Sequence, residues 1–145
     1  MENIQNLIQL MQSAISPIVL ISGVGLLLLS LTNRLGRVID RSRFLVQEIE
    51  AGKGDDNKHL QIGILFKRSR ILRASITSIS LTILFASLMI LLLFLGYFTQ
   101  IDVSFLFITF FVLAICGLIV AIIFFLFDIT ISLKALDIQV EKYRS

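Results

Sequence analysis

The sequence has little charge and few of the residues that build chemical sites. Only 16% of its 145 residues are charged, whereas a soluble domain usually carries about a quarter. It contains one cysteine, one histidine and one proline, and no tryptophan. One chain therefore cannot assemble a Cys/His metal site. The sequence also lacks a glycine-rich phosphate loop, a nucleophile elbow and a zinc motif. We predict a protein that is not an enzyme and has no cofactor.

Apolar residues, in contrast, are abundant and grouped. They make up 57% of the chain, and the mean hydropathy is +0.94. Crossing the hydrocarbon core takes about 20 predominantly apolar residues, and three stretches are long enough. The sequence therefore predicts an all-α integral membrane protein with three transmembrane helices, and we treat residues 1–145 as a single membrane domain. Span one is predicted at 16–32, span two at 74–98 and span three at 103–127.

The basic residues predict the orientation of the chain. Ten of the thirteen Lys and Arg lie between spans one and two, and the other three lie in the C-terminal tail. Because cytoplasmic loops are enriched in Lys and Arg, we expect the N-terminus outside and the C-terminus in the cytoplasm. Basic residues beside a bilayer attract anionic lipids. Few aromatic residues lie among these bases, so we expect lipid contact and no nucleic-acid partner.

The helices are predicted to extend beyond the membrane. Residues 33–73 are expected to form a cytoplasmic helical hairpin that extends spans one and two and turns in the Gly- and Asp-rich stretch 52–57. Residues 128–145 are expected to form a helical cytoplasmic tail. Residues 3–15 are amphipathic, which predicts a short helix at the outer interface, followed by Ser16 as an N-cap. In the alternative, Pro17 kinks one longer helix.

One side of span one and its basic extension carries small and polar residues, at helical spacing. Small residues let transmembrane helices approach closely, so this side is either a helix–helix seam or the lining of a pore in a homo-oligomer. Three spans cannot enclose a channel alone, but a closed symmetric ring can. The candidate residues for this pore or oligomer seam are Ser22, Gly25, Leu29, Asn33, Arg37 and Arg41.

One acidic residue lies at the cytoplasmic boundary of span three. Asp128 ends the apolar run, and a carboxylate at this depth is costly unless it has a partner. We expect an ionic cluster in which Asp128 pairs with Arg34 or Arg73, or accepts hydrogen bonds from Asn33 or Ser75. In the alternative, the carboxylate extends into the lipid headgroups.

The junction between span one and its basic extension resembles a known family. Residues 15–43 read ISPIVLISGVGLLLLSLTNRLGRVIDRSR, and they resemble the opening of the domain-of-unknown-function 2721 family of small bacterial and cyanobacterial membrane proteins. The resemblance is carried by Ser16-Pro17, by Leu31-Thr32-Asn33-Arg34 and by Arg37 through Arg41-Ser42-Arg43, and it covers most of the chain. It implies three spans and a bacterial origin, hence the inner membrane, and it transfers no activity.

Two functions fit these features. The first is a homo-oligomeric, ion-conducting pore lined by span one, in which rings of Arg37 and Arg41 favour anions or form a gate. The second is a non-conducting scaffold or accessory subunit that docks a protein partner through the basic hairpin. The sequence does not identify that partner.

Overall fold

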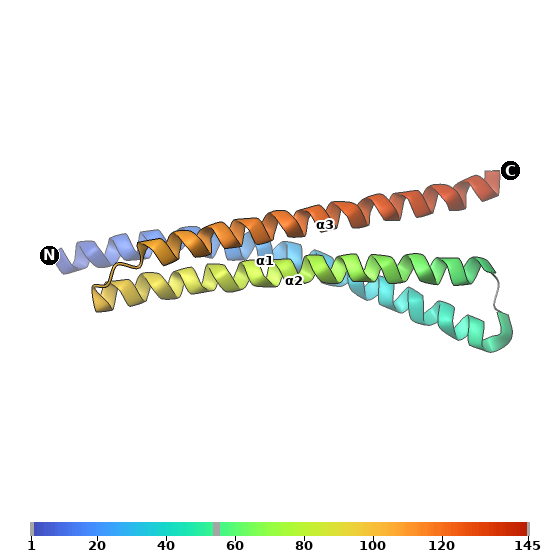
Figure 1. Cartoon of the computed structure of the whole chain (residues 1–145), viewed down its shortest axis with the longest axis horizontal. Coiled ribbons are helices and arrows are strands. Elements are labelled where there is room, and N and C mark those ends of the chain that lie inside the picture. The colour runs from blue at the N-terminus through green and yellow to red at the C-terminus, as the bar shows by residue number, and fades with distance from the viewer. Residues whose placement is uncertain (1, 54–55, 145) are drawn as a thin grey trace. The chain divides into compact units, whose positions relative to one another are not determined.

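The computed structural model describes the backbone of residues 2–53 and 56–144 and the side chains of residues 4–52 and 58–133. Three long helices make up nearly all of this chain: α1 (Glu2–Glu48), α2 (Asp56–Thr99) and α3 (Ser104–Arg144) (Figure 1). A short π-helical segment, Ile49–Lys53, follows α1. The described backbone contains no strand, so the predicted all-helical class is confirmed.

Each of the three helices is long and apolar enough to cross a membrane. The qualifying segments are Ile4–Gly52, Lys58–Thr99 and Ser104–Leu133. The segment in α3 has the smallest buried share, 11%, against 22% in α1 and 28% in α2. Apolar side chains that are exposed on a helix of this length suit a lipid environment. The prediction of an all-helical membrane protein with three apolar helices is confirmed.

The N-terminal region differs from the predicted separate helix at residues 3–15. The structure has one uninterrupted helix from Glu2 to Glu48, with Pro17 inside it, as in the alternative of one longer helix. Proline removes one backbone donor and crowds the carbonyl of the preceding turn, but transmembrane helices tolerate this loss when the freed groups find other partners. Pro17 is itself buried, so packing of its ring supports the continuous helix.

The predicted turn 52–57 begins at Gly52, inside the π-helical segment that follows α1. Gly52 has φ of 76°, in the left-handed region that glycine occupies at little cost. Lys58 at the start of α2 lies 3.0 Å from the carboxylate of Glu48 at the end of α1. The predicted turn overlaps α2 at residues 56 and 57, and its residues 54 and 55 lie outside the described backbone.

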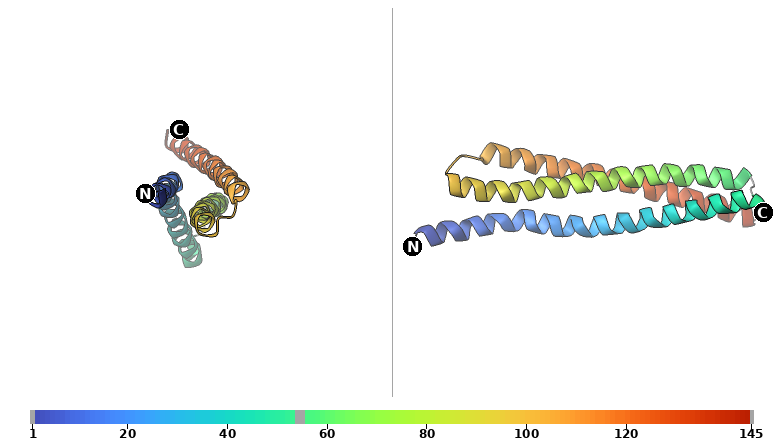
Figure 2. Two further views of the ribbon diagram at one scale, coloured as in Figure 1. Left: turned by 90° about the vertical axis from the view of Figure 1, so that its left-hand side faces the viewer. Right: turned by 90° about the horizontal axis from the view of Figure 1, so that it is seen from below.

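Four residues (100–103) connect α2 to α3. The right-hand view of Figure 2 shows this connection as a short loop. Gln100 adopts φ of 57°, and its N–H donates to the carbonyl of Gly96 at 3.0 Å. A Cβ atom on Gly96 would lie 2.7 Å from Cγ2 of Val103, so the turn requires glycine there. Asp102 accepts a hydrogen bond from the N–H of Ser104 at 2.9 Å, where α3 begins.

The chain divides into two compact units. The first consists of Met1–Leu28 and Ser78–Val120, and the second of Leu29–Thr77 and Ala121–Ser145. Each unit contains a part of all three helices. The buried residues of the first unit include Ala14, Val24, Ile79, Thr82, Ala86, Met89 and Ala114. Those of the second include Leu31, Val38, Leu45, Leu72, Ser75, Ala121 and Asp128.

The buried residues recur at heptad spacing. Five buried residues of α1 fall at intervals of seven (Pro17, Val24, Leu31, Val38 and Leu45), and the buried Ala14 precedes the first of them by three. In α2 the interval alternates between three and four: Leu72, Ser75, Ile79, Thr82, Ala86 and Met89. A repeat of 3.5 residues is the spacing of left-handed helix packing, in which one stripe stays against its neighbours. The opposite side of each helix is left exposed.

Candidate functional site

Polar side chains on α2 bond across to α3 at positions that belong to this repeat. In the second unit, the Ser75 hydroxyl donates to the carbonyl of Ala121 at 2.8 Å. One heptad away on both helices, the Arg68 Nε donates to the Asp128 Oδ1 at 3.0 Å. Since α2 and α3 are antiparallel, seven residues back along α2 correspond to seven residues forward along α3. These two bonds fix the register of α2 against α3 in this unit.

The first unit contains a similar bond. The Thr82 hydroxyl donates to the carbonyl of Ala114 at 3.2 Å and also lies 3.1 Å from the carbonyl of Ser78 on its own helix. A Cβ atom on Gly117 would lie 2.7 Å from the Thr82 Oγ1. The absence of a side chain at Gly117 therefore lets α3 come close enough for this bond.

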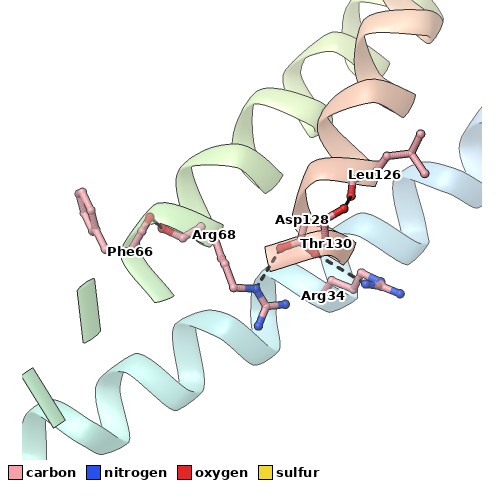
Figure 3. Close-up of polar contacts among 7 residues, drawn as sticks. Arg34, Phe66, Arg68, Leu126, Asp128 and Thr130 are labelled. Carbon is pink, nitrogen blue, oxygen red and sulfur yellow. Dashed lines mark hydrogen bonds and ion pairs between the residues drawn. The ribbon is translucent and has the colours of Figure 1, made fainter. Parts of the chain in front are cut away.

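Asp128 is the centre of the ionic site. Its side chain is 0% exposed, and it receives arginines from two other helices (Figure 3). Arg68 on α2 approaches Oδ1 through Nε at 3.0 Å, and Arg34 on α1 brings Nη1 to 3.6 Å from Oδ2. The second distance is that of an ion pair, too long for a hydrogen bond. Oδ2 accepts no hydrogen bond within the described residues.

The two arginines are less buried than the carboxylate that they share. The Arg34 side chain is 37% exposed and the Arg68 side chain 17% exposed. The Arg34 guanidinium also lies 5.0 Å from the ring centre of Phe125 on α3, within cation–π range. A buried carboxylate needs charge partners and hydrogen bonds to offset its desolvation. The contacts of Asp128 with Arg34 and Arg68 therefore join α1, α2 and α3 in the second unit.

An open cleft of about 370 Å³ lies beside this ion pair. Four arginines line it, Arg34 and Arg68 together with Arg37 and Arg41. The remaining lining residues are Val38, Leu65 and Ser132. Arg37 and Arg41 are exposed, and the Arg41 guanidinium lies 5.5 Å from the ring centre of Phe44. Among the described side chains, the four guanidinium groups that line the cleft and the Asp128 carboxylate that pairs with two of them have a summed formal charge of +3.

The structure brings together only part of the proposed ionic cluster. Arg34 contacts Asp128, but Ser75 donates to Ala121 instead. Arg73 and Asn33 are exposed, and neither makes a hydrogen bond or ion pair with Asp128 in the described part of the chain. Arg68 was not among the predicted residues. The signal that identifies it is the heptad, because Arg68 precedes Ser75 by seven residues and so shares its face.

The proposed pore or oligomer seam on α1 lies away from the buried stripe. Ser22, Leu29, Asn33, Arg37 and Arg41 are exposed, and Gly25 is half-buried. The side of α1 that packs within each unit is the one with Val24, Leu31 and Val38. Ser22, Leu29 and Asn33 therefore lie on a side of α1 that the described residues leave exposed, whereas Arg37 and Arg41 line the cleft beside Asp128.

Metal-binding residues do not gather in the described residues, where no group of three or more His, Cys, Asp or Glu side chains could hold an ion. Cys116 is exposed on α3. The side chains of the basic tail residues Lys134, Lys142 and Arg144 lie outside the described residues. The arginine cleft and the exposed side of α1 are thus the two candidate functional sites.

Comparison with known proteins places the chain in a family. A family model described as a protein of unknown function (DUF2721) matches residues 14–138. The chain belongs to the DUF2721 family. The match includes α1 from Ala14 onward, all of α2 and most of α3, so it covers both the exposed side of α1 and the arginine cleft of this DUF2721 protein. Neither a curated protein nor a solved structure matches the chain.

Proposed function

We propose that this DUF2721 protein is a homo-oligomer of the bacterial inner membrane, with the N-terminus outside and the C-terminus in the cytoplasm. Its exposed α1 side lines an ion-conducting pore at the centre. The observation that carries this proposal is the position of the small and polar residues of α1. Ser22, Leu29 and Asn33 lie on a side that the described residues leave exposed, while the apolar stripe Val24, Leu31 and Val38 is buried.

The energetics of polar groups in lipid favour a covered position for this side. The Ser22 hydroxyl donates to the carbonyl of Ile18 at 3.1 Å, so it is satisfied within the helix. Asn33, however, is exposed and has an amide with two donors and an acceptor. Asn33 directly follows the predicted span 16–32, at the edge of the hydrocarbon, which offers these groups no partner. Water at the membrane boundary, water in a pore or another copy of the chain supplies one.

The exposed side of α3 contrasts with that of α1. Phe105 is 79% exposed, Phe127 58% and Phe111 45%. Large apolar rings are suited to lipid chains, while small residues are suited to close helix approach. In the proposed assembly, α3 therefore faces lipid and α1 faces the axis. Arg37 and Arg41 then stand at the cytoplasmic mouth, where rings of positive charge favour anions or gate the pore.

Conductance with cysteine modification tests the proposal. In a Cys116→Ser background, Leu29→Cys and Leu126→Cys form a matched pair, since the two leucines are 59% and 56% exposed. Reconstituted protein should conduct under voltage or membrane tension. A membrane-impermeant methanethiosulfonate should block the current at position 29 and not at position 126. No current under either stimulus, or equal effects at both positions, would contradict the pore.

A second function has its own observation. Four basic residues of α1 and α2 in the second unit are exposed in addition to those of the cleft: Arg43, Lys67, Arg70 and Arg73. Exposed basic residues on long helices suit a scaffold that docks an acidic protein. A reproducible heteromeric complex after mild solubilisation, together with an absence of current, would favour this scaffold.

A further inference from the structure

The cleft beside Asp128 has more positive charge than the described acidic side chains neutralise. Arg34, Arg37, Arg41 and Arg68 all line it, and Asp128 is the acidic residue paired with two of them. Like charges in one cleft repel each other unless an anion or solvent separates them. We propose that this cleft is a binding site for a phosphate group, with the anion held by guanidinium groups from α1 and α2.

Asp128 orients part of the site and leaves other arginine N–H donors available. It accepts a hydrogen bond from Nε of Arg68 and forms an ion pair with Nη1 of Arg34. A guanidinium has five N–H donors in a planar fork, and within the described residues Arg68 uses only Nε, which leaves its two terminal nitrogens for a ligand. In Figure 3 these two nitrogens point away from the carboxylate. The buried acid therefore acts as a positioning residue, because it fixes a donor fork that faces an anion.

The chemistry of the lining favours phosphate over a simpler anion. A phosphate group presents several strong acceptor oxygens, and arginine binds it through paired N–H···O bonds. Four guanidinium groups and the hydroxyl-bearing Ser132 supply more donors than a halide or one carboxylate can use. Val38 and Leu65 add apolar wall, which suits the glycerol and first methylenes of a phospholipid. The volume of about 370 Å³ also falls among those of ligand sites, about 300–1,000 Å³.

The phosphate can come from a lipid headgroup or from a soluble phosphate. Both sources offer the same group to the same arginines. The cleft is built from residues of one chain, so it does not need another copy. It shares Arg37 and Arg41 with the mouth of the proposed pore, and different measurements therefore test the two proposals: ligand binding for the cleft, and current with modification at Leu29 for the pore.

The test compares two double variants of the full-length protein with the same change in charge. Arg37→Gln with Arg41→Gln removes two exposed arginines of the cleft and leaves the pair that holds Asp128. Arg43→Gln with Arg70→Gln removes two exposed arginines outside it. One arm titrates detergent-solubilised protein with dioleoyl-phosphatidylglycerol, and with dioleoyl-phosphatidylcholine as reference, by native mass spectrometry. The other arm titrates inorganic phosphate into phosphatidylcholine nanodiscs by calorimetry, in chloride at about 0.15 M, where screening acts over about 8 Å.

The wild-type protein should bind one ligand per chain with saturation in at least one arm. The cleft variant should bind at least tenfold more weakly than the matched variant. Binding of phosphatidylglycerol alone identifies a lipid headgroup as the source, and saturation by inorganic phosphate identifies a soluble phosphate. Equal weakening of both double variants would reduce the effect to general surface charge and overturn the site. No saturable binding in either arm would overturn it as well.

Discussion

Replacing Asp128 by Ala removes the one carboxylate that joins three helices in the second unit. Arg68 loses a charge-assisted hydrogen bond of 3.0 Å, and such bonds contribute about 1.5–3 kcal/mol. Arg34 loses an ion pair at 3.6 Å while its side chain is 37% exposed, so its share is about 0.5 kcal/mol. Because Arg68 is itself only 17% exposed, leaving its charge without a partner adds to the cost. We expect Asp128→Ala to lower the free energy of unfolding by about 3 kcal/mol.

Equilibrium unfolding in mixed micelles with increasing sodium dodecyl sulfate measures this loss. Near-ultraviolet circular dichroism follows it, because helical structure persists in this detergent while side-chain packing is lost. Asp128→Asn keeps the volume and an acceptor for Arg68, so it should cost about half as much. A double-mutant cycle between Asp128→Asn and Arg68→Gln should give a coupling energy of about 1–2 kcal/mol.

Arg73 provides the control, since it is exposed and makes no ion pair with Asp128 among the described residues. The coupling between Asp128→Asn and Arg73→Gln should be near zero. If the free energy of unfolding of Asp128→Ala lies within about 0.5 kcal/mol of the wild-type value, the carboxylate does not hold the three helices together. Equal coupling to Arg68 and Arg73 would also refute this role of the carboxylate, since the effect would then be one of general charge.

Two further predictions concern the helix contacts. Gly117→Ala should lower the free energy of unfolding by about 1–2 kcal/mol, since its Cβ would meet the Thr82 hydroxyl at 2.7 Å. Gly23→Ala places its Cβ where nothing lies within 4 Å, so it should leave the free energy of unfolding unchanged or raise it. The same micelle titration measures both variants. Two hydrogen bonds from Ser104 hold the pKa of Asp102 below its ordinary 3.8, and the bond from the Ser104 side chain has the larger effect. The ionised carboxylate therefore stabilises the start of α3 above pH 3.8. This contribution is lost as the pH falls through the lowered pKa. A carboxyl titration by nuclear magnetic resonance should show the Asp102 midpoint below 3.8, and Ser104→Ala should return it toward 3.8; an unchanged midpoint would contradict the cause.

The apolar stretches alone were enough to predict three membrane-crossing helices, because the length and polarity of a span follow from the thickness of the bilayer. They were not enough to predict the N-terminal half of α1. Ser16-Pro17 is typical of a helix start in water. The buried ring of Pro17 contributes instead to an apolar stripe that continues through it, and the helix is not interrupted.

The ionic site shows a second limit of sequence reasoning. Asp128 and Arg34 were both named, because a carboxylate at the end of an apolar run needs a base at similar depth. Arg68 was not, since depth counted along one helix does not say which face a residue occupies. The face follows from the heptad, which becomes evident once Ser75 is seen to bond α3. Small and polar residues at helical spacing mark one side of α1, but this spacing does not show whether that side packs within the chain.

The proposed pore requires that the exposed side of α1 contact other copies of the chain. The most direct test is the mass of the particle released from nanodiscs, measured by native mass spectrometry for the wild type and for Leu29→Trp and Leu126→Trp. These two leucines have matched exposure, 59% and 56%. We expect one closed oligomer for the wild type and for Leu126→Trp, and smaller species for Leu29→Trp. A wild-type monomer, or an oligomer that Leu29→Trp leaves intact, would contradict the proposed pore.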